Sequence, residues 1–129
     1  MSPVPNTPFS LDTHTVGIGR DGAAILIEQV PGPPKRIDGL SVGRAPVHGP
    51  GPHGGERHPD GDEVLILLSG RVEVRLEEEG GDRTVELLPG QAFVVPKGVW
   101  HRVVSEEPSE LVFVTPGPRG DHRPLESDT

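Results

Sequence analysis

Short apolar segments separated by turn residues recur along the chain and predict a protein built from β-strands. Residues 71–77 alternate strictly between charged and apolar side chains, which predicts a strand with Val72, Val74 and Leu76 facing the core. Residues 64–68 are apolar on both faces, so we expect one face to be covered by the interior and the other by a second sheet, an arm or a partner subunit. The predicted strands are 23–30, 37–44, 63–68, 71–76, 84–88, 92–95, 99–104 and 111–115.

The composition excludes long helices and favours this all-β interpretation. The 129 residues include 18 Gly and 16 Pro, and both residue types interrupt helices. Many short, regularly spaced strands are typical of a sandwich or barrel, and the length fits one domain. We expect a flexible N-terminal arm at residues 1–12, a single barrel at 13–118 and a disordered tail at 119–129.

Charge and residue usage narrow the range of partners. A formal net charge of −8 disfavours nucleic acid and anionic membranes as partners. No apolar run is long enough to span a bilayer, and residues 1–10 lack the features of a secretory signal, so we expect a cytoplasmic protein. The chain has no cysteine, which leaves His, Asp and Glu as the strong metal ligands.

Four residues are candidates for a metal site. Glu56 and His58 are two positions apart, so they face the same way if this segment is extended. The turn residues 59–62 then return the chain so that Glu63, at the head of an apolar strand, lies beside them. His101 is a polar residue among apolar neighbours on a later strand. A buried carboxylate needs a partner, and a cation would satisfy it.

Two motifs that contain these residues resemble those of the cupin superfamily. The first motif of the family is His, one residue, His, three or four residues, Glu, six residues, Gly; here it is Glu56, His58, Glu63 and Gly70. The second is Gly, five residues, Pro, one residue, Gly, two residues, His, three residues, Asn. In this chain the corresponding residues are Gly90, Pro96, Gly98, His101 and Ser105.

This resemblance covers residues 56–105 and implies a fold, a site and a subunit arrangement. It implies an antiparallel double-sheet β-barrel of the cupin or jelly-roll type that forms a homodimer. The metal ligands implied are His58, Glu63 and His101, with Glu56 in the place of the first family histidine. We therefore expect one divalent first-row metal ion, Fe, Mn, Ni or Zn. A structural site without metal is the alternative for these residues.

The departures from the family pattern concern Glu56 and Ser105. Glu56 either ligates the ion, which would make a divalent site neutral, or acts as a catalytic general base. His53 is an alternative fourth ligand, because Gly54 and Gly55 give the backbone freedom. Because His ligands must be neutral, metal affinity is expected to fall as the pH drops through roughly 6.5.

Other polar residues are expected to lie outside the site. We expect His48 and His53 to be surface loop residues, and Trp100 to serve in packing. Arg44 and Arg102 would bind an anionic ligand if they pointed inward, but they are expected to be solvated. His14 and His122 carry no functional signal.

The resemblance implies a metal-dependent enzyme that acts on a small oxygenated metabolite, of dioxygenase, isomerase, lyase or decarboxylase type. A non-catalytic module that binds a metal or a small molecule is the alternative function, and a structural remnant is a third.

Overall fold

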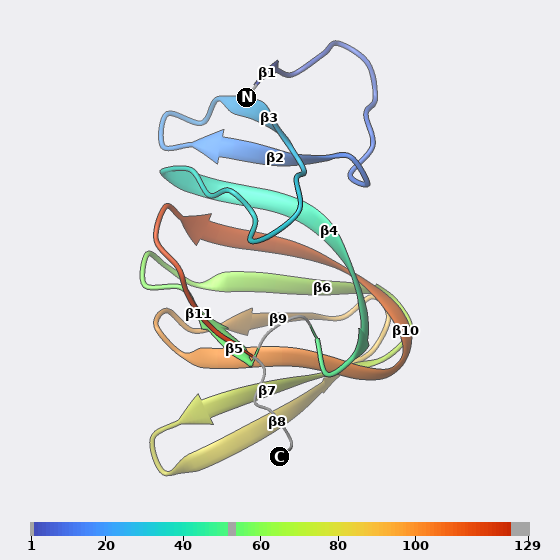
Figure 1. Cartoon of the computed structure of the whole chain (residues 1–129), viewed down its shortest axis with the longest axis vertical. Coiled ribbons are helices and arrows are strands. Elements are labelled where there is room, and N and C mark those ends of the chain that lie inside the picture. Colours follow the sequence, from blue (N-terminus) through green and yellow to red (C-terminus); the bar gives the residue numbers. More distant parts are fainter. Residues whose placement is uncertain (1, 52–53, 125–129) are drawn as a thin grey trace.

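The computed structural model describes residues 2–51 and 54–124, in which the regular structure is entirely β-strand (Figure 1). No helix in this part of the chain could cross a membrane. The predicted all-β, antiparallel fold is confirmed. The strands are β1 (Ser2–Pro3), β2 (His14–Gly19), β3 (Ala24–Glu28), β4 (Gly39–Gly49), β5 (Gly55–Arg57), β6 (Glu63–Ser69), β7 (Val72–Glu78), β8 (Gly81–Leu87), β9 (Ala92–Val95), β10 (Trp100–Gly117) and β11 (Asp121–Arg123).

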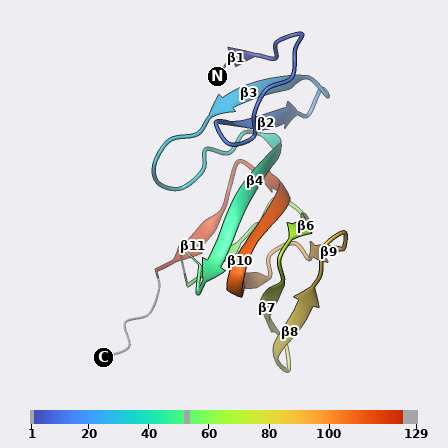
Figure 2. The same ribbon diagram turned by 90° about the vertical axis from the view of Figure 1, so that its right-hand side faces the viewer.

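The strands form two antiparallel sheets that share β10. The first sheet has the order β1-β3-β2-β4-β10-β6-β9, and the second has the order β8-β7-β10-β5-β11. The β2–β3 hairpin lies at one end of the molecule and the β7–β8 hairpin at the other (Figure 2). The pairing of β10 with β4 is irregular between Ser105 and Ser109, where β10 passes from the second sheet into the first.

The core lies between the sheets. The predicted alternation of residues 71–77 is confirmed, because Val72, Val74 and Leu76 are at most 1% exposed. On β6, Leu65 and Leu67 join the same core. The outer face of β6 is covered only in part by the described residues, and Leu68 at its end is 48% exposed.

Two predicted strands merge and several were missed. Segments 99–104 and 111–115 belong to the single strand β10, while the prediction omitted β1, β2, β5 and β11. The glycines of β2 look like strand breakers in the sequence. At Gly17, however, a Cβ atom would lie 2.8 Å from Ile37 Cδ1, so close packing against Ile37 explains the absence of a side chain.

The domain limits of 13–118 stay a prediction. Strand pairing extends beyond both limits, because β1 pairs with β3 and β11 pairs with β5. Residues 125–129 of the expected tail lie outside the described residues.

Candidate metal centre

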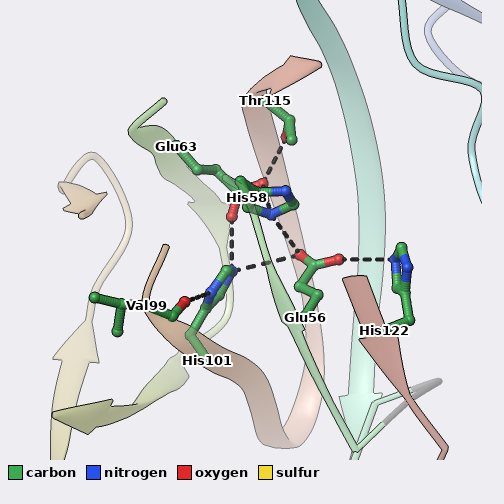
Figure 3. A network of polar contacts seen from close by, with 7 residues as sticks. All are labelled: Glu56, His58, Glu63, Val99, His101, Thr115 and His122. Carbon is green, nitrogen blue, oxygen red and sulfur yellow. Dashed lines mark hydrogen bonds and ion pairs between the residues drawn. The ribbon is translucent and has the colours of Figure 1, made fainter. Parts of the chain in front are cut away.

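Strand register places Glu56 in the middle of the site. β5 lies between β10 and β11, and Glu56 is paired with His101 on one side and with His122 on the other. Side chains directly opposite one another on neighbouring strands point to the same face of a sheet. The three side chains therefore project together toward the space between the sheets (Figure 3).

The turn between β5 and β6 brings His58 and Glu63 to the same place. The amide of Gly98 donates to the carbonyl of His58 at 3.0 Å, and the amide of Lys97 donates to Asp62 Oδ1 at 2.8 Å. These bonds attach the turn to Lys97 and Gly98, which lie just before β10, the strand that carries His101. Residues 59–62 therefore reverse the chain as predicted, and Glu63 lies beside His58.

The four candidate ligands form one buried cluster. One ligand atom from each of Glu56, His58, Glu63 and His101 lies within 4.8 Å of all the others. His101 Nε2 is 3.0 Å from Glu63 Oε1 and 3.5 Å from Glu56 Oε1. His58 Nε2 is 3.2 Å from Glu63 Oε2 and 3.4 Å from Glu56 Oε1. Neighbouring ligands at right angles around an ion, with bonds of about 2.1 Å, are about 3 Å apart, so the donor spacing fits a first-row metal.

Hydrogen bonds fix how His101 presents its ring. Its Nδ1 lies 3.0 Å from the carbonyl oxygen of Val99, which can only accept a hydrogen bond, so Nδ1 carries the proton. In the neutral ring Nε2 is then the unprotonated nitrogen, and it faces Glu56 and Glu63. Such a bond on the far nitrogen is what orients a metal-binding imidazole.

The nitrogen of His58 that faces the cluster lacks a hydrogen bond. Nε2 is buried and makes no hydrogen bond of good geometry with the described residues, although two carboxylates lie within ion-pair distance. A buried polar atom without such a bond is costly. A cation held between His58 and the carboxylates would satisfy it, so the residues present fit a metal ion.

Without metal, the two imidazoles act as the cations of the cluster. Burial opposes charge on His58, but Glu56 and Glu63 outweigh it and raise its pKa to about 9. The same balance raises the pKa of His101 to about 10. For Glu63, burial favours the neutral acid, yet the hydrogen bond from His101 and the positive charge of nearby His58 hold the pKa of the carboxyl below its ordinary value.

Thr115 and His122 complete the surroundings of the two carboxylates. Thr115 Oγ1 donates to Glu63 Oε2 at 2.5 Å, and His122 Nε2 lies 3.3 Å from Glu56 Oε2. His122 was expected to carry no functional signal, so its place beside Glu56 is a correction. The contact depends on the pairing of β11 with β5, for which the local sequence carries no signal.

The remaining candidates lie away from the cluster or serve the fold. His48 is exposed, as predicted, but it lies on strand β4 rather than in a loop, and His53 lies outside the described residues. Trp100 packs beneath two guanidinium groups, those of Arg57 and Arg123. The Ser105 hydroxyl lies within hydrogen-bonding distance of the carbonyl oxygens of Arg71 and Glu107, where β10 changes sheets.

A cavity of about 600 Å³ adjoins the cluster. Its polar lining includes Glu56, Glu63, His122 and Arg36, and its walls include the apolar side chains of Ala45, Val47, Leu65, Val103, Leu111 and Phe113. A largely apolar pocket with a few convergent polar groups is typical of a site for a small molecule.

Comparison with known proteins gives a family match and similar folds. Residues 47–115, more than half of the chain, match the family described as Cupin domain. No curated protein matches the chain. Oxalate oxidase in complex with the substrate analogue glycolate aligns with a TM-score of 0.54 at 19% identity, over 64% of this chain and 45% of that one.

Two further structures share the fold. A cupin-2 domain containing protein from Shewanella frigidimarina has a TM-score of 0.51 at 23% identity, over 70% of this chain and 85% of its own. Oxalate decarboxylase from Bacillus subtilis, a protein with Mn(II) centres, has a TM-score of 0.56 at 18% identity, over 64% of this chain and 23% of its own. This chain thus spans less than half the length of either oxalate enzyme, and these identities show a shared fold alone.

Proposed function

The chain belongs to the cupin family, and we propose that it binds one divalent first-row metal ion, Fe, Mn, Ni or Zn, through Glu56, His58, Glu63 and His101. The four donors converge at the edge of a cavity, and this convergence is the main support for a metal site. His58 Nε2 is buried there and lacks a good hydrogen bond. Two imidazoles and two carboxylates suit these metals better than soft copper(I).

We further propose a metal-dependent enzyme that acts on a small oxygenated metabolite, of dioxygenase, isomerase or decarboxylase type. When bound, the ion would polarise a substrate oxygen or activate dioxygen. The chain's own residues orient the ligands: the Val99 carbonyl holds the His101 ring and Thr115 holds one oxygen of Glu63.

Metal content and turnover together test this proposal. Protein purified without a histidine tag should contain close to one first-row metal per chain, or take it up on loading. Oxygen uptake with catechols, diketones and keto acids, and product analysis without oxygen, then test catalysis. A metal-loaded protein that is silent across the panel would favour the non-catalytic binding module. A protein that takes up no metal would overturn the metal proposal.

Glu56 has two proposed roles, fourth metal ligand and general base, and a single substitution distinguishes them. Because Glu56 is also placed to accept a proton, it is our candidate general base as well as the fourth ligand. We expect Glu56→Gln to weaken zinc binding about tenfold, since three other ligands remain. Competition with a chromophoric chelator measures the change. Unchanged zinc affinity with lost turnover would assign Glu56 to the base role alone.

The outer face of the first sheet supports a homodimer. Register places Val16, Val42, Val114, Val64 and Val94 side by side across neighbouring strands. Val94 is 51% exposed. On this face Arg44 and Glu110 form an ion pair beside the row, and Glu28 lies at the far edge on β3, opposite His14. We infer that a second copy of the chain packs on this apolar row, because identical faces of this kind match each other without charge repulsion.

A cytoplasmic location stays a prediction.

We expect Val94→Glu to convert the dimer to a monomer. The substitution would place a charge in the interface but leave it solvated in the monomer, since Val94 is exposed there. Leu88→Glu is the matched control, because Leu88 is 40% exposed in the turn after β8. Analytical ultracentrifugation measures both variants. A wild-type monomer, or a dimeric Val94→Glu protein, would contradict this interface.

A further inference from the structure

A positively charged side chain that the metal centre does not use lies in the same cavity. Arg36 precedes β4 and lines the cavity together with Glu56 and Glu63. Its guanidinium lies over the ring of Phe113, with Cζ 5.2 Å from the ring centroid. Nη1 is buried and makes no hydrogen bond with the described residues.

The environment of Arg36 is unfavourable for an unpaired cation. Burial lowers the pKa of its guanidinium from the ordinary value, and the charges of Glu56 and Glu63 oppose this effect without forming an ion pair with it. Arginine nevertheless stays charged in proteins. The buried Nη1–H therefore lacks a partner among the described residues, and the guanidinium to which it belongs is part of a side chain that lines the cavity. A buried donor without a partner calls for one in the functional state.

The charge balance indicates what that partner is. The cavity lining contains two carboxylates, one arginine and the histidines His48 and His122. Of the permanently charged groups, Glu56 and Glu63 together neutralise a divalent ion, so Arg36 contributes one uncompensated positive charge when the metal is bound. A ligand with one negative charge would bring the cavity to neutrality. A dianion would leave an uncompensated charge among apolar walls, which is costly.

We propose that Arg36 is the anion-recognition residue of the cavity and that the substrate is a small organic monocarboxylate. The inference rests on the proposed function, since it describes what the metal site acts upon. The carboxylate accepts hydrogen bonds from the guanidinium, whose planar fork matches its two oxygens. The apolar part of the substrate packs against walls such as Phe113 and Leu111.

Other arginines that were candidates for this role face elsewhere. Arg44 forms an ion pair with Glu110 at 2.9 Å on the outer face of the first sheet. Arg102 donates from Nη2 to the carbonyl of Pro50 at 2.6 Å. The expectation that neither is an anion site agrees with these contacts. Arg36 is thus a specificity residue that sequence reasoning did not identify.

The test uses three four-carbon probes and the zinc-loaded protein. Butanoate is the monoanion, butanamide its uncharged counterpart and succinate the dianion. Calorimetric or NMR titration of the wild type should give butanoate an affinity about tenfold or more above that of the other two. Arg36→Met should remove this preference while leaving zinc content at one per chain. Arg20→Met, the matched control in the exposed turn after β2, should retain it.

Arg36→Lys guards against a variant that fails to fold. It keeps the charge and loses the planar fork, so we expect butanoate affinity between those of the wild type and Arg36→Met. Equal binding of butanoate and butanamide by the wild type, or an unchanged preference in a folded Arg36 variant, would overturn the inference. If zinc does not bind, the metal proposal fails by itself, and the same titrations of the metal-free protein still decide the role of Arg36.

Discussion

Replacing Glu63 with glutamine is expected to weaken metal binding at least about a hundredfold and to destabilise the metal-free protein by about 2–4 kcal/mol. Glu63 is 2% exposed, and its two oxygens meet His101, His58 and Thr115. The amide keeps the size of the carboxyl group but provides one acceptor oxygen and no charge. Its single oxygen cannot accept both the bond that His101 makes to Oε1 and the bond that Thr115 makes to Oε2, and the substitution removes the anion that holds the imidazoles in their charged form.

Two measurements separate the effects of this substitution. Chelator competition gives the change in zinc affinity, and urea unfolding of the metal-free protein gives the free energy of unfolding. Glu73→Gln is the matched control, because Glu73 pairs with Arg75 on the exposed face of β7 in the second sheet. Wild-type zinc affinity in Glu63→Gln would remove Glu63 from the ligand set. Wild-type stability would show that the contacts of the buried carboxylate contribute no net stabilisation.

The pH dependence of metal binding should be steep. With pKa values of about 9 for His58 and about 10 for His101, both rings are protonated at pH 7 in the metal-free protein. A metal ion can bind only neutral imidazole, so each ion displaces about two protons. Zinc affinity should therefore rise about a hundredfold per pH unit between about pH 6 and pH 8. The decline in affinity should begin near pH 10 and steepen below pH 9, rather than start near 6.5, because the carboxylates stabilise both imidazolium ions.

Calorimetry in buffers of different ionisation enthalpy counts the released protons directly. His48→Gln should leave the count at about two, because His48 is exposed and outside the cluster. His101→Gln should reduce it to about one. A wild-type count near zero would mean that the rings are neutral before metal binds, contrary to the raised pKa values.

The same shifts determine the stability of the metal-free protein. A raised folded-state pKa on His58 and His101 stabilises the fold below the unfolded value of about 6.5, and that contribution is lost as the pH rises through about 9 to 10. The lowered pKa of Glu63 acts at the other end, since its contribution is lost as the pH falls below the ordinary value. The metal-free protein should therefore lose stability toward both acid and alkali.

The parts of this protein that could be predicted from sequence depend on local spacing. Alternation identified Val72, Val74 and Leu76 as core residues, and motif spacing selected Glu56, His58, Glu63 and His101, which the structure brings together. These signals are read within a few residues along the chain. The role of the four as metal ligands remains our proposal.

What the sequence did not reveal depends on pairing between distant segments. His122 reaches Glu56 because β11 pairs with β5, and Arg36 reaches the cavity because the segment before β4 passes over Phe113. β5 and β11 have three residues each, too few for a periodic pattern. Pro108 and the polar residues around it separate the two apolar parts of β10, so one long strand resembles two.

The passage of β10 from one sheet to the other has a consequence for the unfolded chain. His101 lies in the part of β10 that belongs to the second sheet, while Glu63 begins β6 in the first sheet, 38 residues earlier. An ion bound to both would close this segment as a disulfide would, in a chain that has no cysteine. By the chain-entropy argument, a cross-link over such a loop restricts the unfolded ensemble by up to about 4 kcal/mol. Unlike a disulfide, such a metal cross-link would be broken by acid or by a chelator and would need no reductant.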